Sequence, residues 1–259
     1  MAQLLAGKTA AITGAVTGIG RAIALEYLKH GASVAVNHFP DDQSAAQFEE
    51  MTREAGEGAK LIAVAGDVSK PETGQELVRK AVDAFGGRLD IFVSNAGVCQ
   101  FAEFLTMSPD LVNHTISTNL NGAFFAVQAA AQQMAKQSPS GGSIIGISSI
   151  SALVGGAGQT HYTPTKAGIT SLMQSTACAL GKYGIRCNAL LPGTIRTQLN
   201  DEDLADTKKQ AYMEGRIPLG RLGATQDLAG PAVFLASDLS GYVTGAQLLV
   251  DGGLFVNLQ

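Results

Sequence analysis

The sequence has no tryptophan, only three cysteines and few charged side chains. Cys99, Cys178 and Cys187 form no CxxC pair and leave an odd number, which argues against a disulfide framework and against a zinc site. The scattered histidines also lack the spacing of metal ligands, so we expect no metal. These absences predict a protein of a reducing compartment, and we expect the cytoplasm.

An excess of positive charge is also absent. The 18 lysines and arginines are outnumbered by 22 aspartates and glutamates, which gives a net charge of -4. Without a basic field we expect no nucleic acid partner. No apolar run is long enough to span a bilayer, and the N-terminus lacks the basic and apolar regions of a signal peptide, so we expect no membrane partner. A small, neutral substrate fits these properties.

Short apolar runs alternate with longer amphipathic stretches along the whole chain, and no linker divides them. The expected strands are residues 9–13, 33–37, 60–65, 91–94, 143–148, 186–191 and 247–250. The expected helices are residues 19–30, 42–54, 71–85, 109–135, 162–183 and 226–236. This alternation predicts a single α/β domain over residues 1–259, with a doubly wound parallel sheet of about seven strands and helices on both faces.

A glycine-rich turn follows the first expected strand and leads into the first expected helix. It reads Thr13-Gly14-Ala15-Val16-Thr17-Gly18-Ile19-Gly20. Glycines in a turn between a strand and a helix let the backbone approach a pyrophosphate, whose charge is favoured at a helix N-terminus. The turn therefore predicts a dinucleotide site. The expected cofactor-binding residues here are Gly14, Thr17, Gly18, Ile19 and Gly20.

The second expected strand ends in Asn37 and His38, where dinucleotide-binding proteins usually recognise the adenosine ribose. An acidic residue there would bind the 2′-hydroxyl, and a basic one would favour a 2′-phosphate. Neither is present, and Val16 and Thr17 supply no cation from the turn. We expect NAD as the cofactor, with NADP accepted as well if His38 tolerates the phosphate. An ordinary surface position for His38 is the alternative.

Two further loops follow the third and fourth expected strands. Asp67 and Val68 stand where a carboxylate oxygen and a backbone N–H could bind adenine, although Asp67 could instead cap the next helix. Asn95, Ala96 and Gly97 offer the small side chains that a wall beside the nicotinamide ribose requires, or else form a simple turn. We include all five among the cofactor-binding residues.

The spacing of Ser149, Tyr162 and Lys166 predicts a device for proton transfer. A phenol has a pKa near ~10, so it is a poor base at neutral pH unless positive charge stabilises its ionised form. On a helix, Lys166 lies one turn beyond Tyr162 on the same face, and its ammonium could supply that charge. Ser149 would hold the substrate oxygen. Since His161 is adjacent to Tyr162, it points about 100° away, and we assign it a structural or oligomeric role.

With these motifs the chain resembles the short-chain dehydrogenase/reductase family over its whole length. The matching segments are Thr13 to Gly20, Asn95-Ala96-Gly97, Asn119, Ser149, Tyr162-Thr163-Pro164-Thr165-Lys166, Pro192-Gly193 and Asp251-Gly252-Gly253. The resemblance implies a Rossmann-type fold with Tyr162 as acid/base. It also implies that Lys166 lowers the pKa of Tyr162 and binds the nicotinamide ribose, and that Tyr162 is itself among the cofactor-binding residues. Asn119 would interrupt a helix and hold a water that relays the proton.

The resemblance divides the domain into a cofactor half, residues 1–140, and a catalytic half, residues 141–259. It implies that Pro192 and Gly193 cover the nicotinamide, with Ile195 and Thr197 near its amide. Residues 194–222 form a polar segment after a late strand, where a substrate lid would lie. By the same resemblance we expect a homotetramer, with residues 254–259 near an interface.

Four stretches carry a narrower resemblance within the family: residues 92–99, 146–156, 212–219 and 251–259. They look like members that oxidise C1 of L-rhamnose or a related aldose to the lactone, which implies a sugar substrate. The expected substrate-binding residues are Ser149, Ser151, Gln159, Tyr162, Thr194 and Arg196. For Ser151, Gln159, Thr194 and Arg196, structural roles are equally open. The alternatives are a 3-oxoacyl reductase of the same family and a non-catalytic dinucleotide sensor.

Overall fold

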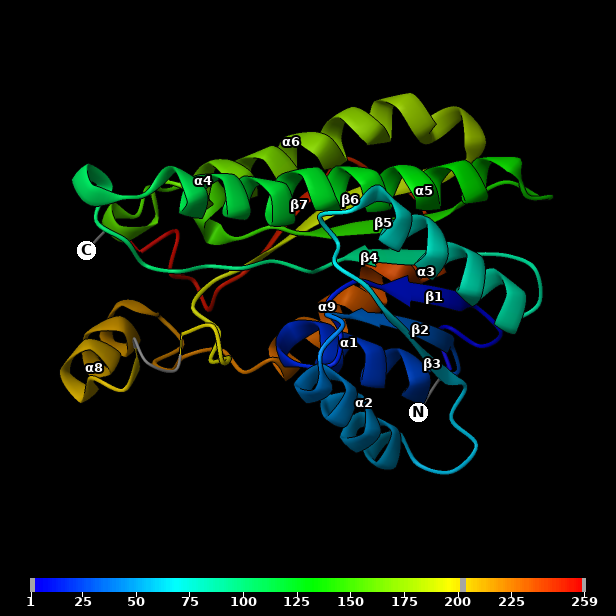
Figure 1. Cartoon of the computed structure of the whole chain (residues 1–259), viewed down its shortest axis with the longest axis horizontal. Helices are drawn as coiled ribbons and strands as arrows, with labels where there is room; N and C mark the ends of the chain where they lie inside the picture. The colour runs from blue at the N-terminus through cyan, green and yellow to red at the C-terminus, as the bar shows by residue number, and fades with distance from the viewer. Residues whose placement is uncertain (1–2, 201–203, 258–259) are drawn as a thin grey trace.

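One parallel sheet of seven strands forms the centre of the computed structural model, which describes residues 3–200 and 204–257 (Figure 1). The strands are β1 (Thr9–Ile12), β2 (Ser33–His38), β3 (Leu61–Ala65), β4 (Ile91–Ser94), β5 (Gly142–Ile147), β6 (Ile185–Pro192) and β7 (Gln247–Val250). Their order is β3-β2-β1-β4-β5-β6-β7, and every pair is parallel. The predicted doubly wound sheet is confirmed. Because the order reverses between β1 and β4, a crevice is expected at the carboxyl ends of these two strands.

Helices cover both faces of the sheet. One layer consists of α1 (Gly18–Lys29), α2 (Asp42–Ala55) and α9 (Gln226–Ala236) (Figure 1). The other consists of α3 (Pro71–Ala84), α5 (Gly122–Lys136) and α6 (Tyr162–Leu180), with α4 (Pro109–Ile116) beside α6. Within the described residues, no helix combines the length and the apolar character needed to cross a bilayer.

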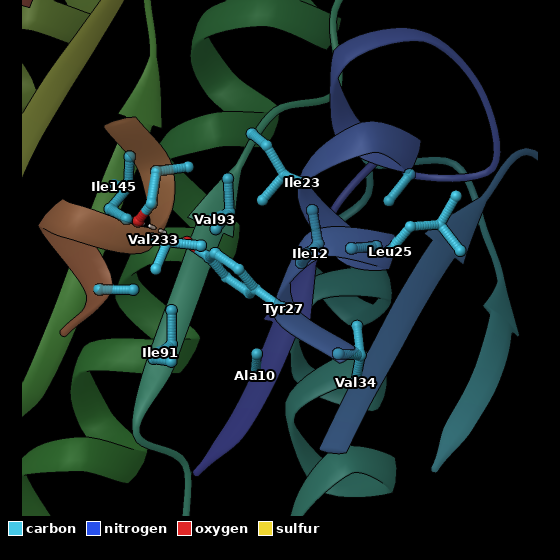
Figure 2. Packing of buried hydrophobic residues seen from close by; sticks show 14 of the residues in the cluster. Ala10, Ile12, Ile23, Leu25, Tyr27, Val34, Ile91, Val93, Ile145 and Val233 are labelled. Carbon is cyan, nitrogen blue, oxygen red and sulfur yellow. Dashed lines mark hydrogen bonds between the residues drawn. The ribbon is translucent and has the colours of Figure 1, made fainter. Parts of the chain in front are cut away.

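The core divides into two clusters because side chains alternate along each buried strand. Ile12 packs under α1 and α9, whereas its neighbour Ala11 packs under the opposite layer. Figure 2 shows Tyr27 of α1 in the first cluster, close to Val233 of α9. The Tyr27 hydroxyl donates a hydrogen bond of 3.0 Å to the Ala232 carbonyl. Burial raises the pKa of Tyr27 above its usual range, so the side chain stays neutral and its one polar group is satisfied.

The structure departs from the expected helices in two places. The helix expected over 109–135 is interrupted by a π-helical segment, Ser117–Asn121, between α4 and α5. This interruption is the one that the family resemblance implied at Asn119. The polar segment after β6 contains a helix that was not expected, α8 (Thr207–Arg216). Its N-cap is Asp206, whose carboxylate accepts bonds from the Lys208 and Lys209 amides.

Candidate active site

A cavity of about 1230 Å³ opens at the carboxyl ends of the strands, where the strand order reverses. The predicted cofactor-binding residues that line it are Gly14, Thr17, Gly18, Ile19, Asn37, His38, Asp67, Val68, Asn95, Ala96, Gly97, Tyr162, Lys166, Pro192, Gly193, Ile195 and Thr197. The predicted substrate-binding residues that line it are Ser149, Ser151, Gln159, Tyr162 and Thr194. Three predicted site residues lie off its wall: Gly20, Asn119 and Arg196.

The glycine-rich turn is held against the end of β4 by close packing and hydrogen bonds. Gly14 has a φ of +59°, and a Cβ there would lie 2.8 Å from the Ala96 Cα, so only glycine fits. The Asn95 side-chain amide donates to the Gly14 carbonyl at 2.7 Å. A Cβ on Gly20 would lie 2.7 Å from the same carbonyl. Gly20 therefore lets α1 pack beneath the turn and supports the cavity from behind.

The N-terminus of α1 is suited to an anion. Its N-cap, Thr17, makes no side-chain capping bond, and the first turn carries no acidic residue. The first backbone N–H groups of a helix have no partner within the helix and carry partial positive charge. Together with the small residues of the turn and the volume of the cavity, this end fits the pyrophosphate of a dinucleotide.

The side chains at the ends of β2 and β3 also stabilise the turn. Asn37 accepts a bond of 3.3 Å from the Gly14 amide, and its own amide group donates to the Val64 and Gly66 carbonyls at 3.2 and 2.9 Å. Asp67 accepts a bond of 2.9 Å from the Ser69 amide. The alternative that Asp67 caps the next helix is wrong, because the N-cap of α3 is Lys70 and the Asp67 carboxylate binds the Ser69 amide ahead of that helix. Asp67 also lines the cavity.

The predicted proton-transfer residues lie together at one end of the cavity. Ser149 follows β5, and its hydroxyl accepts a bond of 3.0 Å from the Ser151 amide. Tyr162 and Lys166 occupy the first two turns of α6, and the Lys166 Nζ lies 5.5 Å from the centre of the Tyr162 ring. The same ammonium donates to the Ile147 carbonyl at 3.0 Å, which holds it beneath the phenol. The one-face arrangement expected from the spacing is present.

Burial is the largest cause of the pKa shifts of both Tyr162 and Lys166. It raises the pKa of Tyr162 above its usual range, the charge of Cys99 adds to this rise, and a hydrogen bond with Ser149 opposes it. Burial lowers the pKa of Lys166 from 10.5 to about 8, against the opposing charge of Cys99. At neutral pH the lysine is therefore still largely charged while the phenol is protonated. Ionising Tyr162 requires further positive charge beside it.

Asn119 lies behind the cavity wall and joins the segment after β4 to helix α6 through hydrogen bonds. It is fully buried; its Oδ1 accepts from the Val98 amide at 2.8 Å, and its Nδ2 donates to the Val98 carbonyl at 2.9 Å and to the Thr165 hydroxyl at 3.3 Å. A Cβ on Gly97 would lie 3.3 Å from the Asn119 Oδ1 and 3.5 Å from the Lys166 Nζ. Gly97 therefore leaves space beside the ammonium, and the water relay through Asn119 stays a prediction.

Arg196 is the predicted substrate residue that the structure does not bring to the cavity. It lines a separate hollow of about 370 Å³, together with Glu214 and Arg221. His161, to which we assigned no catalytic role, is also off the cavity wall. It is buried, and neither ring nitrogen has a hydrogen-bond partner among the described residues. No group of three or more histidine, cysteine or acidic side chains within those residues could hold a metal ion.

Several residues that line the cavity were not predicted from the sequence. Cys99 and Phe101 lie two and four residues beyond Gly97, a position that could have identified them, and Gln159 donates to the Cys99 sulfur at 3.2 Å. Three more, Lys209, Tyr212 and Met213, come from α8 at helical spacing. Figure 1 shows α8 set apart from both helix layers, and residues 201–203 of the predicted lid lie outside the described residues.

Comparison with known proteins identifies relatives along the full length of the chain. The family model described as enoyl-(acyl carrier protein) reductase matches residues 14–255. L-rhamnose-1-dehydrogenase of Scheffersomyces stipitis is 66% identical over 260 residues and covers 100% of both chains. L-rhamnose 1-dehydrogenase (NAD(P)(+)) of a Sphingomonas species is 61% identical, with 99% of this chain and 100% of that protein covered.

Two further relatives are a solved structure with a similar fold and an enzyme whose name gives an acyl substrate instead of a sugar. A crystal structure of a putative short-chain alcohol dehydrogenase from Sinorhizobium meliloti has a TM-score of 0.92 and 33% identity over 100% of both chains. A 3-oxoacyl-[acyl-carrier-protein] reductase of Staphylococcus aureus is 36% identical over 96% of this chain and 98% of its own length. The acyl reductase is thus a more distant relative than the two sugar dehydrogenases.

Proposed function

We propose that this chain, which belongs to the short-chain dehydrogenase/reductase family, oxidises the C1 hydroxyl of L-rhamnose to the lactone and passes the hydride to NAD or NADP. The observation that carries the proposal is the group of Ser149, Tyr162 and Lys166 at the end of a cavity suited to a dinucleotide. The names of two full-length relatives above 60% identity support the choice of sugar.

The chemistry begins with proton transfer at Tyr162. The Ser149 hydroxyl and the Tyr162 oxygen hold the C1 hydroxyl of the sugar between them, and the phenolate removes its proton. When bound, the oxidised nicotinamide supplies the hydride acceptor and a positive charge beside the phenol. As the C1–H bond breaks, a C1=O bond forms while the ring oxygen is retained, so the product is a lactone. General-base catalysis of this kind contributes roughly 10²–10⁴-fold to the rate.

Lys166 and Ser149 stabilise the ionised form of Tyr162, which acts as the base. The Lys166 ammonium lies 5.5 Å from the ring centre, and a positive charge at this distance favours the phenolate. The Ser149 hydroxyl favours it through a hydrogen bond, which lowers the pKa of Tyr162. The Ile147 carbonyl fixes the Lys166 ammonium, which would also bind the nicotinamide ribose when the cofactor is present. Asn119 fixes Val98, four residues beyond β4, against Thr165 in the first turn of α6. By the family resemblance it would also hold the water that relays the proton.

Recognition of the sugar requires hydrogen bonds to several hydroxyls, since burying a hydroxyl without a partner costs binding energy. Ser151, Gln159 and Thr194 line the cavity near the reacting end and supply such groups. Arg196 is excluded from this set because it lines a different hollow. Residues from α8, including Tyr212 and Met213, cover the sugar as part of the lid.

The test is the initial rate of nicotinamide reduction with L-rhamnose, L-lyxose, L-mannose and D-glucose, each with NAD and NADP. We expect a strong rate confined to L-rhamnose and its close stereochemical relatives, with both cofactors. The absence of a rate with every sugar would contradict the proposal. A 3-oxoacyl reductase would then be the first alternative to test, because the same catalytic group reduces ketones.

We also propose that the enzyme is a cytoplasmic homotetramer. Exposed apolar side chains, including Phe104, Leu105 and Phe124 next to α4 and in α5, support association between copies. Within residues 254–259, assigned to an interface, 258 and 259 lie outside the described residues. Within the described residues none of the three cysteines forms a disulfide, in keeping with a reducing compartment. Light scattering that found a monomer at micromolar concentration would contradict the tetramer.

A further inference from the structure

Two side chains of α2 line the cavity near the end of β2 and take no part in the proposed proton transfer. They are Ser44 and Gln47, which lie three positions apart and therefore share one helix face. Both are half-buried. The backbone amide of Ser44 is bound by the capping residue Asp41, but within the described chain no hydrogen bond occupies the Ser44 hydroxyl or the Gln47 amide group.

The polar side chains at the end of β2, Asn37 and His38, are already engaged in hydrogen bonds within the protein. Asn37 is committed to the Gly14 amide and to carbonyls of the β3 region. The His38 ring is stacked on Phe48, with centroids 6.4 Å apart, and its Nδ1 lies 2.8 Å from the Phe39 carbonyl. A carbonyl can only accept, so Nδ1 carries a proton and is committed to this bond.

No fixed charge lines the cavity from β2 or α2. The described lining residues from this region are Asn37, His38, Phe39, Ser44 and Gln47. Arg21, in the first turn of α1, does not line the cavity, and its guanidinium lies 2.8 Å from a Glu54 oxygen. A carboxylate at this end would repel a ribose 2′-phosphate, and an unpaired guanidinium would attract it. Among the described residues, neither form of discrimination comes from β2, α2 or the turn between them. The carboxylate of Asp67, after β3, also lines the cavity and accepts a hydrogen bond from the Ser69 amide.

We propose that Ser44 and Gln47 form an uncharged site that accepts either a ribose 2′-hydroxyl or a 2′-phosphate, and so determine the use of both NAD and NADP. The Ser44 hydroxyl and the Gln47 N–H groups donate to phosphate oxygens. The Ser44 oxygen and the Gln47 carbonyl accept from a hydroxyl. The inference rests on the proposed dinucleotide cofactor and adds the residues that set its selectivity.

The test is isothermal titration of the full-length protein with NAD and with NADP, without sugar. Gln47→Glu is expected to weaken NADP binding by at least ~10-fold relative to NAD binding, because a carboxylate would face the 2′-phosphate. Ser44→Asp is expected to act in the same direction. Gln47→Arg is expected to shift the ratio at least ~10-fold toward NADP. The matched control is Gln43→Glu, the same change on an exposed residue of α2 that does not line the cavity.

The outcomes separate this inference from the proposed function. If Gln47→Glu and Gln47→Arg change the NADP to NAD ratio no more than Gln43→Glu does, the inference is wrong. Equal weakening of both cofactors would also overturn it, because the effect would then be structural. If Gln47→Glu does not fold, Gln47→Arg and Ser44→Asp decide the result. Failure of the wild-type protein to bind either dinucleotide would instead contradict the proposed function.

Discussion

Tyr162→Phe is expected to reduce turnover of L-rhamnose at least ~100-fold while the protein still binds the dinucleotide. The substitution keeps the buried ring and its packing over the Lys166 ammonium, 5.5 Å from the ring centre, and removes only the oxygen that takes the proton. Because the glycine-rich turn and the ends of β2 and β3 are untouched, cofactor affinity should change little. The measurement is kcat with L-rhamnose, paired with titration of NAD.

The matched control is Tyr183→Phe, the same change at a partly exposed tyrosine just beyond α6 that does not line the cavity. It should leave both turnover and binding unchanged. Turnover of Tyr162→Phe within a few-fold of the wild type would show that another group removes the proton. Loss of NAD binding as severe as the loss of turnover would assign Tyr162 a structural role.

Lys166→Met is expected to reduce turnover at least ~100-fold and, in the free protein at neutral pH, to increase stability. Burial lowers the pKa of Lys166 from 10.5 to about 8, so burying the charged ammonium costs up to about 3 kcal/mol. Methionine removes this cost, although it leaves the Ile147 carbonyl without the ammonium as a partner. The net gain should therefore be smaller, about 1–2 kcal/mol.

The pH dependence identifies the cause of that gain. The folded-state pKa of this lysine lies below its unfolded value, so the cost is complete below about pH 8 and disappears as the pH rises toward 10.5. The stability advantage of Lys166→Met over the wild type should shrink across this window. Chemical denaturation at pH 7 and pH 10 measures it, with the exposed Lys182→Met as the control. A variant less stable than the wild type at pH 7 would contradict the predicted cost.

Much of the fold was predictable because the signals for its elements are local. Buried parallel strands appear as short apolar runs, and the expected strands 91–94 and 247–250 match β4 and β7 to the residue. The break at Asn119 was implied only by the family resemblance, because residues 109–135 have a continuous helical pattern. Its side-chain bonds to Val98 join residues 21 positions apart, and such contacts leave no trace in local periodicity. Helix α8 was missed because it is polar.

In the candidate site, too, the residues that were predicted correctly depend on local sequence patterns, and those that were missed or misplaced depend on contacts between distant segments. The glycine-rich turn and the pair Tyr162 and Lys166 depend on short spacings along the chain, and the structure brings both to the cavity. Arg196 depends on a contact between distant segments. Ile195 forms a bridge with Gly223, and the Arg196 amide donates to the Gly223 carbonyl, so its side chain lies in the hollow beside residues 221–225. Ser44 and Gln47 were missed because only the packing of α2 brings them to the cavity.

In the proposed reaction the C1 hydrogen of L-rhamnose moves as hydride to the nicotinamide, and isotopic labelling follows that transfer. The wild-type protein is incubated with L-rhamnose deuterated at C1 and with NAD, and the reduced cofactor is isolated for mass spectrometry and NMR. We predict one deuterium at the nicotinamide C4 for each lactone formed, and the same result with NADP. Reduced cofactor without deuterium, or no reduction at all, would contradict the proposed reaction.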